Sequence, residues 1–282
     1  MKNTIQHILI PINFSDSADA AITTGIAMCK RHHAALHLLY VKEENTFVFP
    51  PGKFARNLEL VLEAEMTTLD KLEIQAKKIE KEHGLDCFFY VAEGPMNKAV
   101  ASIAEDFYCD LIILEKTHKA QLFNFVKNNS ASKLTDYVKC PVLTIPTETN
   151  YQDFKNVLFP VRPAPAGMGN LEVALPIIKE NDSNVLLFPL KQKENLNQQE
   201  TVSEFNSRTA DLNGIGHIII DDKVNVSVDM AQDVVRKAME DCSDLIIVTA
   251  SIKKGLKSLF TRNYTEKIID NSPVPVLSVK LA

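Results

Sequence analysis

The sequence predicts an α/β protein made of two tandem domains, each a doubly wound parallel sheet with helices on both faces. Three observations lead to this prediction. Short apolar runs alternate along the chain with segments of helical periodicity, and the second half repeats landmarks of the first. The length of 282 residues suits two domains that each bury a core of their own.

The repeat consists of three pairs of landmarks in the same order: HILIPINF and KNVLFPVR, DLIIL and DLIIV, and CPVLTI and VPVLSV. The distance from Asp110 to Pro141 is 31 residues, and so is the distance from Asp244 to Pro275. Between the first and second landmarks the second copy is 15 residues shorter. The chain therefore holds two copies of one fold.

The joint between the copies falls in a short polar segment, PTETNYQD, at residues 146–153. We accordingly place the two domains at residues 1–148 and 152–282.

The elements of the first copy follow from local patterns. Runs of β-branched and aliphatic residues that are apolar on both faces are typical of strands in a covered parallel sheet. These runs are His7–Ile12, Leu36–Val41, Cys87–Val91, Leu111–Leu114 and Val142–Ile145. The segments between them predict helices over Ser17–Arg31, Asn57–His83, Pro95–Phe107 and Ser130–Val138.

Two of these helices carry end signals. The segment SDSAD is a cap-like opening of the first helix, which makes Ser15 and Ser17 capping residues. The second helix has apolar residues about every 3.5 positions amid Glu and Lys, the period of an amphipathic helix. Gly84 is expected to end it.

The second copy gives the same alternation. Its predicted strands are Asn156–Phe159, Asn184–Pro189, His217–Ile220, Leu245–Val248 and Val276–Val279. Its predicted helices are Leu171–Lys179, Glu200–Leu212, Asp229–Asp241 and Thr265–Asp270. The shortening falls in the second helix and the loop before it. In the first copy that loop, Lys42–Ala55, holds Phe47 and Phe49 and is either a surface loop or a lid.

Composition excludes several functional classes. The net charge of -5 and the lack of clustered Lys and Arg argue against nucleic-acid binding. No apolar run approaches the roughly 20 residues that cross a bilayer, and the apolar start is too short for a signal peptide. The five cysteines are scattered without a C-x-x-C pair, so neither a disulfide framework nor a thiolate zinc site is expected. We expect a cytoplasmic protein.

Three further observations concern possible metal binding, catalysis and anion binding. His32, His33 and His37 cluster, but the pattern changes from helix to strand near Ala34, so we expect cations at a helix end and not a metal site. No nucleophile motif is present, so no enzyme activity beyond weak ATP hydrolysis is expected. The basic stretch 251–262 is interpreted as a solvated face, with an anion, a membrane surface or an acidic partner as alternatives.

A strand ending P-x-x-F-S-x-S, a D-L-I-I strand and a P-V-L-x-[IV] strand, in that order, resemble the universal stress protein (UspA-like) family. The matching residues are Pro11, Phe14, Ser15 and Ser17, then Asp110–Ile113 and Pro141–Leu143, with Pro160, Asp244–Ile247 and Pro275–Leu277 in the second copy. The resemblance covers the whole chain and implies a tandem member. It implies Rossmann-like, adenine nucleotide alpha hydrolase-like domains, each with a five-stranded parallel sheet of order 3-2-1-4-5. It also implies an intramolecular pseudo-dimer through Val142–Ile145 and Val276–Val279.

In family members that bind ATP, an acidic residue follows the first strand and a G-x-x-G, nine residues, G-[ST] loop holds the phosphates. The acidic position reads Asn13 here and Arg162 in the second copy. The glycine and hydroxyl positions fall on Glu115, His118, Asn128 and Asn129, or, one residue later, on Lys116, Lys119, Asn129 and Ser130. In the second copy they fall on Thr249, Ile252, Arg262 and Asn263. None of these family glycine positions is occupied by a glycine that would let backbone amides approach phosphate.

The resemblance and these departures predict a cytosolic stress-response binding or interaction module with degenerate ATP sites in both halves. The alternatives are an ATP- or AMP-binding regulator that uses the first domain and a small-ligand carrier that uses the Phe47 and Phe49 loop. The candidate crevice of the first domain comprises Asn13, Val41, Lys116, His118, Lys119, Asn129 and Ser130. We expect a protein partner, and a homodimer is a further possibility; no nucleic acid or membrane partner is expected.

Overall fold

The fold is described from a computed structural model. The structure describes residues 4–14, 19–42, 54–116, 131–146, 151–161, 169–192, 217–221, 225–250 and 256–280. The first half consists of β1 (His7–Ile12), α1 (Asp19–His32), β2 (Ala35–Lys42), α2 (Phe54–His83), β3 (Cys87–Glu93), α3 (Met96–Asp106), β4 (Leu111–Lys116), α4 (Ala131–Leu134) and β5 (Val142–Pro146).

The second half repeats this alternation. Its described elements are β6 (Asn156–Val161), α5 (Gly169–Asn181), β7 (Asn184–Gln192), β8 (His217–Ile220), β9 (Asn225–Ser227), α7 (Met230–Glu240), β10 (Leu245–Ala250), α8 (Leu256–Asn271) and β11 (Val276–Lys280).

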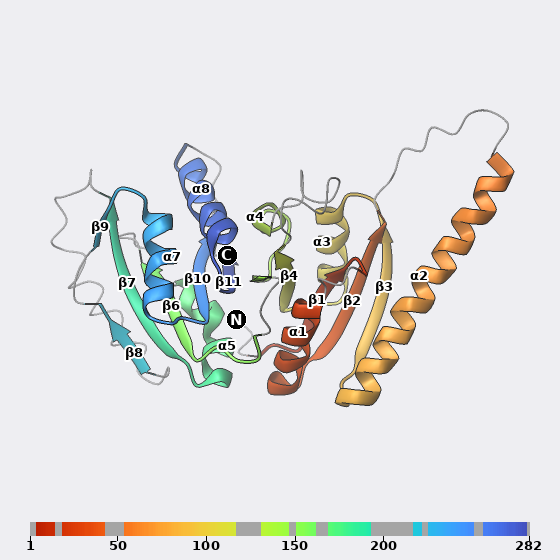
Figure 1. Ribbon diagram of the computed structural model, residues 1–282, viewed down its shortest axis with the longest axis horizontal. Helices are drawn as coiled ribbons and strands as arrows, with labels where there is room; N and C mark the ends of the chain where they lie inside the picture. The colour runs from red at the N-terminus through yellow and green to blue at the C-terminus, as the bar shows by residue number, and fades with distance from the viewer. Residues whose placement is uncertain are drawn as a thin grey trace.

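The strands of both halves form one sheet, as Figure 1 shows. Their order is β3-β2-β1-β4-β5-β11-β10-β6-β7-β8, and β9 pairs with β7 off this path. Each half thus has the predicted order 3-2-1-4-5, with parallel pairing inside the half. β5 and β11 run antiparallel, with Leu143 opposite Leu277, and join the two halves.

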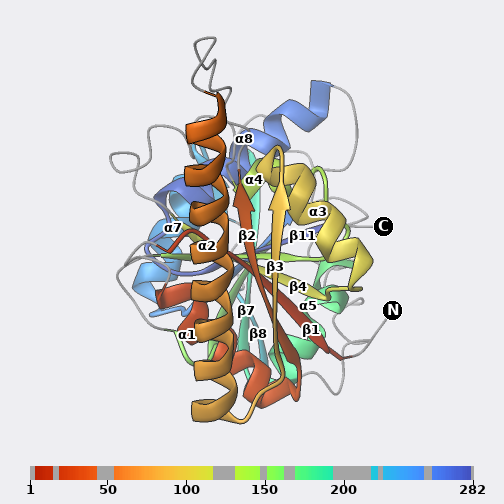
Figure 2. The same ribbon diagram turned by 90° about the vertical axis from the view of Figure 1, so that its right-hand side faces the viewer.

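Helices cover both faces of the sheet. On one face, under α1, α2 and α5, a single buried apolar cluster extends from Leu72 in the first half to Leu171 and Leu277 in the second. On the other face, α3 and α4 cover a cluster around Val100, and α7 and α8 cover one around Val234. Figure 2 shows α1 and α2 on one side of the strands of the first half and α3 on the other.

The aspartate of the repeated D-L-I-I landmark has the same structural role in both halves. The Asp110 carboxylate accepts hydrogen bonds from the backbone amides of Gln6 and His7, over 2.8 and 3.2 Å. The Asp244 carboxylate accepts hydrogen bonds from the two backbone amides at the start of β6, at 2.9–3.0 Å. This residue therefore fastens the first strand of each half to the fourth.

Helix ends are repeated as well. Non-glycine residues with positive φ follow α1 and α5 (His33, 54°; Asp182, 48°) and follow α3 and α7 (Tyr108, 52°; Cys242, 51°). This left-handed conformation ends a helix but strains any side chain except that of glycine. α2 ends at His83, and Gly84, with φ of 65°, follows it as the sequence predicts.

Two predicted helices need correction, and one strand was not predicted. α4 ends at Leu134, not at Val138, because the next residues form turns with hydrogen bonds such as Tyr137 N to Leu134 O, 2.9 Å. α8 begins at Leu256 and not at Thr265; Leu256, Leu259 and Phe260 have the i, i+3, i+4 spacing of a helix, a signal that the prediction did not use. The three-residue β9, which pairs with β7, was missed because its sequence, NVS, contains no apolar run.

Several predictions lie outside the described residues. They are the helix at Glu200–Leu212, the caps at Ser15 and Ser17, and the loop with Phe47 and Phe49. Among the described residues, no helix has the length and apolar character needed to span a membrane.

Candidate functional site

The candidate crevice forms where β1 and β4 separate. These strands pair only at Ile8 with Leu111 and at Leu9 with Ile112, near their amino ends. By contrast, β2 pairs with β1 along the whole length of β1, and β5 pairs with β4 up to Lys116 at its end. The carboxyl ends of β1 and β4 therefore flank the topological switch point, where ligands bind in open α/β sheets.

The second half has the same opening. β6 and β10 pair only at Val157 with Leu245 and at Leu158 with Ile246. Beyond it, the backbone carbonyl of Thr249, at a family glycine position, accepts a hydrogen bond of 3.0 Å from the Thr265 hydroxyl of α8. That carbonyl is therefore tied to the following helix.

Asn13 lies directly after β1, at one wall of the first crevice, and is partly exposed. The next residue, Phe14, has a positive φ of 54°, so the chain turns sharply here. The Phe14 ring packs against Tyr40, with ring centroids 5.4 Å apart, and Lys71 Nζ of α2 lies 5.9 Å from the Phe14 centroid. Aromatic packing thus fixes the turn that positions Asn13.

Lys116 lies at the end of β4, but its ammonium is engaged elsewhere. Its Nζ donates a 3.0 Å hydrogen bond to the backbone carbonyl oxygen of Ser272, just after α8 in the second half. Burial lowers the pKa of Lys116, and the charge of Asp270 opposes this shift. The cation at this family glycine position therefore binds the other half of the chain.

Val41 is buried, with 4% of its surface exposed, and packs into the cluster beneath α3. Only its backbone is therefore available to a ligand. The other predicted crevice residues, His118, Lys119, Asn129 and Ser130, lie outside the described residues, as does Arg162 in the second half.

The histidine cluster divides between a helix end and the sheet interior. Lys30, Arg31 and His32 form the last turn of α1, and His33 follows it, whereas His37 is buried in β2. Within the described part of the chain, no group of three or more His, Cys, Asp or Glu side chains is arranged to hold a metal ion.

His37 is buried and belongs to a chain of polar side chains, with the partly exposed His7 and Tyr90, that the sequence did not predict. Its Nε2 lies 3.0 Å from His7 Nδ1, and its Nδ1 lies 3.0 Å from the Tyr90 hydroxyl. The rings of Phe88 and Phe107 flank it, at centroid distances of 5.2 and 5.8 Å. Burial, with a smaller effect of His7, lowers the pKa of His37 to about 4. The available signal in the sequence was the place of His37 among apolar residues of a strand predicted to be buried on both faces.

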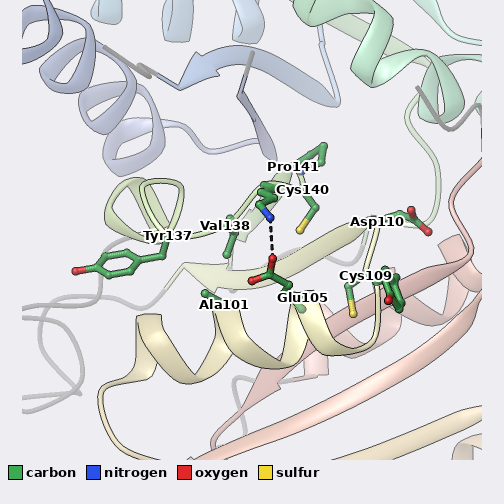
Figure 3. A pocket seen from close by; sticks show the side chains of 11 residues that line it. Ala101, Glu105, Cys109, Asp110, Tyr137, Val138, Cys140 and Pro141 are labelled. Carbon is green, nitrogen blue, oxygen red and sulfur yellow. Dashed lines mark hydrogen bonds and ion pairs between the residues drawn. The ribbon is translucent and has the colours of Figure 1, made fainter. Parts of the chain in front are cut away.

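A cavity at the opposite edge of the sheet was also not predicted. It has a volume of about 420 Å³ and lies between α3 and the segments that precede β4 and β5 (Figure 3). Its residues are scattered over two distant segments, so no motif marks them in the sequence.

Comparison with known proteins identifies the fold. A family model described as the universal stress protein family matches residues 4–146. A universal stress protein from Archaeoglobus fulgidus is 14% identical, with 99% of this chain and 98% of that chain covered and a TM-score of 0.71. A putative universal stress protein from Pseudomonas aeruginosa is 16% identical, with coverages of 99% and 94% and a TM-score of 0.62.

A half-length structure also matches. The universal stress protein UspA from Lactobacillus plantarum is 21% identical and covers 51% of this chain and 99% of its own length, with a TM-score of 0.43. No curated protein sequence matches this chain.

Proposed function

Because this chain belongs to the universal stress protein family, we propose that it acts in the cytoplasm as a stress-response binding module and not as an enzyme. Its two nucleotide sites are degenerate in this proposal, and its physiological ligand is a protein partner. The sequence supports this because no family glycine position of either phosphate loop holds a glycine and because Asn13 and Arg162 replace the acidic residue.

The main structural support for the proposal is the hydrogen bond that the Lys116 ammonium donates to the Ser272 carbonyl oxygen. Among the predicted crevice residues that the structure describes, Lys116 is the only lysine. A lysine that neutralises a phosphate needs a free, hydrated ammonium. Here the ammonium is half-buried and donates to a carbonyl oxygen at a helix end, where the helix dipole also favours a cation.

A second candidate, an ATP- or AMP-binding regulator, is favoured by the open switch point of the first half. β1 and β4 separate after Leu9 and Ile112, and Asn13 stands at the mouth of the opening. An asparagine amide can accept and donate hydrogen bonds to a nucleoside, although it lacks a carboxylate's charge.

The experiment that separates the two is to purify the full chain without added ligand, denature it and analyse the released small molecules. We expect no stoichiometric nucleotide. Calorimetric titration of ATP and AMP into the native protein should likewise give no saturable heat. One nucleotide released per chain would overturn the proposal and support the regulator.

The variant Lys116→Met tests the assignment of that lysine. We expect it to leave nucleotide titrations as featureless as those of the unmodified protein. If the unmodified protein does bind ATP and Lys116→Met weakens that binding, the lysine is a phosphate ligand. Its hydrogen bond to Ser272 then no longer supports the proposal.

A further inference from the structure

The cavity of Figure 3 lies far from the crevice within the same half. Its walls are α3, the turn that follows it, and the segment before β5. Asp110 and Pro141 line it and directly precede β4 and β5, so it opens at the amino ends of the strands. Binding in this cavity does not involve the residues of the predicted nucleotide crevice. The volume of about 420 Å³ falls within the range of small-molecule sites.

The thiols of the cavity form an uncharged wall. Burial raises the pKa of Cys109 and of Cys140 to about 12, with smaller effects of nearby acidic groups. Both thiols are therefore protonated at neutral pH and are poor nucleophiles. Together with Ala101, Ala104 and Val138 they give a small, polarisable and apolar lining.

The charged groups around this wall favour a cation. α3 ends with Glu105 and Asp106 and has no basic residue in its last turn, so acidic side chains add to the negative end of the helix dipole. Asp110 lies at the other side of the cavity from Tyr137. Lys139 is the only cationic side chain that lines the cavity, within the part of the chain that the structure describes.

Lys139 shows where an ammonium group binds. Its Nζ donates a 2.7 Å hydrogen bond to Glu105 Oε1, the contact drawn as a dashed line in Figure 3. The two side chains are 87% and 69% exposed, and ion pairs of this kind contribute little to stability. A ligand ammonium can therefore replace that of Lys139 at small cost. Tyr108 and Tyr137 line the cavity and are both exposed, so their electron-rich ring faces are accessible to a cation.

The second half provides an internal comparison. The structural residues Asp110 and Pro141 recur there as Asp244 and Pro275. The four polar residues of the cavity mouth do not recur: Glu105 is replaced by Met239, Tyr108 by Cys242, Tyr137 by Asn271 and Lys139 by Pro273. The fold therefore does not require this set.

We propose that the cavity is a binding site for an organic ammonium compound with a ring-sized apolar body. The ammonium binds Glu105 in place of Lys139, and the body lies against the thiols and alanines. Glu105 sets the specificity for positive charge.

The test is an NMR titration of the full chain, followed on the backbone amides, with 2-phenylethylamine as probe. A ligand of this size is expected to bind with a Kd of about 1 mM. The matched compound 3-phenylpropanoate has the same ring and the opposite charge, and we expect it not to saturate the site. Shifts should centre on residues 101–110 and 137–141.

Two variants and a control complete the test. We expect Glu105→Gln to weaken binding of the amine about fivefold and Lys139→Met to strengthen it about threefold, since charge-assisted hydrogen bonds are stronger than neutral ones. The control is Glu73→Gln, which removes the carboxylate of another exposed ion pair, with Lys77 on α2, and should change nothing. The proposal is overturned if the amine gives no saturable shifts, if the carboxylate binds as well, or if Glu105→Gln and Glu73→Gln behave alike.

Discussion

The ammonium of Lys116, at the end of β4, caps the backbone carbonyl of Ser272, which follows α8 in the other half of the chain, over 3.0 Å. The second half makes a weaker contact of the same kind with the first: Lys280 Nζ lies 3.5 and 3.4 Å from the carbonyl oxygens of Asp136 and Val138. Each half thus contributes a lysine to the end of a helical segment of the other. These contacts reinforce the pairing of β5 with β11.

Lys116→Met should lower the free energy of unfolding by about 1–2 kcal/mol, because a hydrogen bond from a charged donor is lost and a helix-end carbonyl is left without it. Chemical denaturation measures this change. Lys280→Met serves as the comparison: its hydrogen bonds are longer, so its effect should be smaller. Equal losses of unfolding free energy in the two variants would show that the Lys116 hydrogen bond stabilises the protein no more than those of Lys280 do.

The repeated aspartates are expected to be stabilising in both halves. Asp110→Ala and Asp244→Ala each remove a carboxylate that accepts hydrogen bonds from two consecutive backbone amides. We expect each variant to lose about 2 kcal/mol of unfolding free energy. Asp86→Ala, outside the repeated motif, is the control. A loss at only one of the two positions would contradict the equivalence of the halves.

The buried histidine predicts a loss of stability in acid. Burial lowers the pKa of His37 in the folded chain from its ordinary value of 6.5 to about 4. Between these values the unfolded state holds more protons, so stability falls as the pH is lowered, by about 3 kcal/mol over the whole window. Denaturation at a series of pH values measures this slope.

His37→Phe should flatten the slope between pH 6.5 and 4, because the group that takes up the proton is gone. His217→Phe, at an exposed position of β8, should retain it. An unchanged slope in His37→Phe would assign the acid sensitivity to other groups.

Cys242→Gly should stabilise the protein by up to about 1 kcal/mol, because Cys242, two residues after the end of α7, has a φ of 51° that glycine adopts without strain. Thermal unfolding measures the gain. Cys242→Ser removes the exposed thiol but keeps a side chain and should give no gain. If serine stabilises as much as glycine, the thiol and not the backbone is responsible.

The strands were predictable because their signal is local. Runs such as His7–Ile12 are apolar on both faces, and burial on both sides of a parallel sheet requires this. The order of the strands and the join through Leu143 and Leu277 came from the family resemblance, since apolar runs alone do not state which strands become neighbours.

The missing predictions depend on contacts between distant residues. The partner of Lys116 is 156 residues away, so the sequence placed that lysine in the crevice without showing its hydrogen bond. The cavity beside Glu105 combines a helix end with a segment about 30 residues later, and neither segment carries a recognisable pattern. The start of α8 was missed for a different reason: Leu256, Leu259 and Phe260 have helical spacing, but they belong to the basic stretch that is interpreted as a solvated face.

The antiparallel join of β5 and β11 has a consequence for how the two halves can change. In a dimer of identical chains every substitution appears twice, so a residue useful at one site is imposed on the other. Here the symmetric join lies within a single chain, and each half is encoded separately. Glu105 can therefore form an ion pair in one half while Met239 occupies the equivalent position in the other. The covalent link frees each half to specialise while the shared sheet keeps both in place.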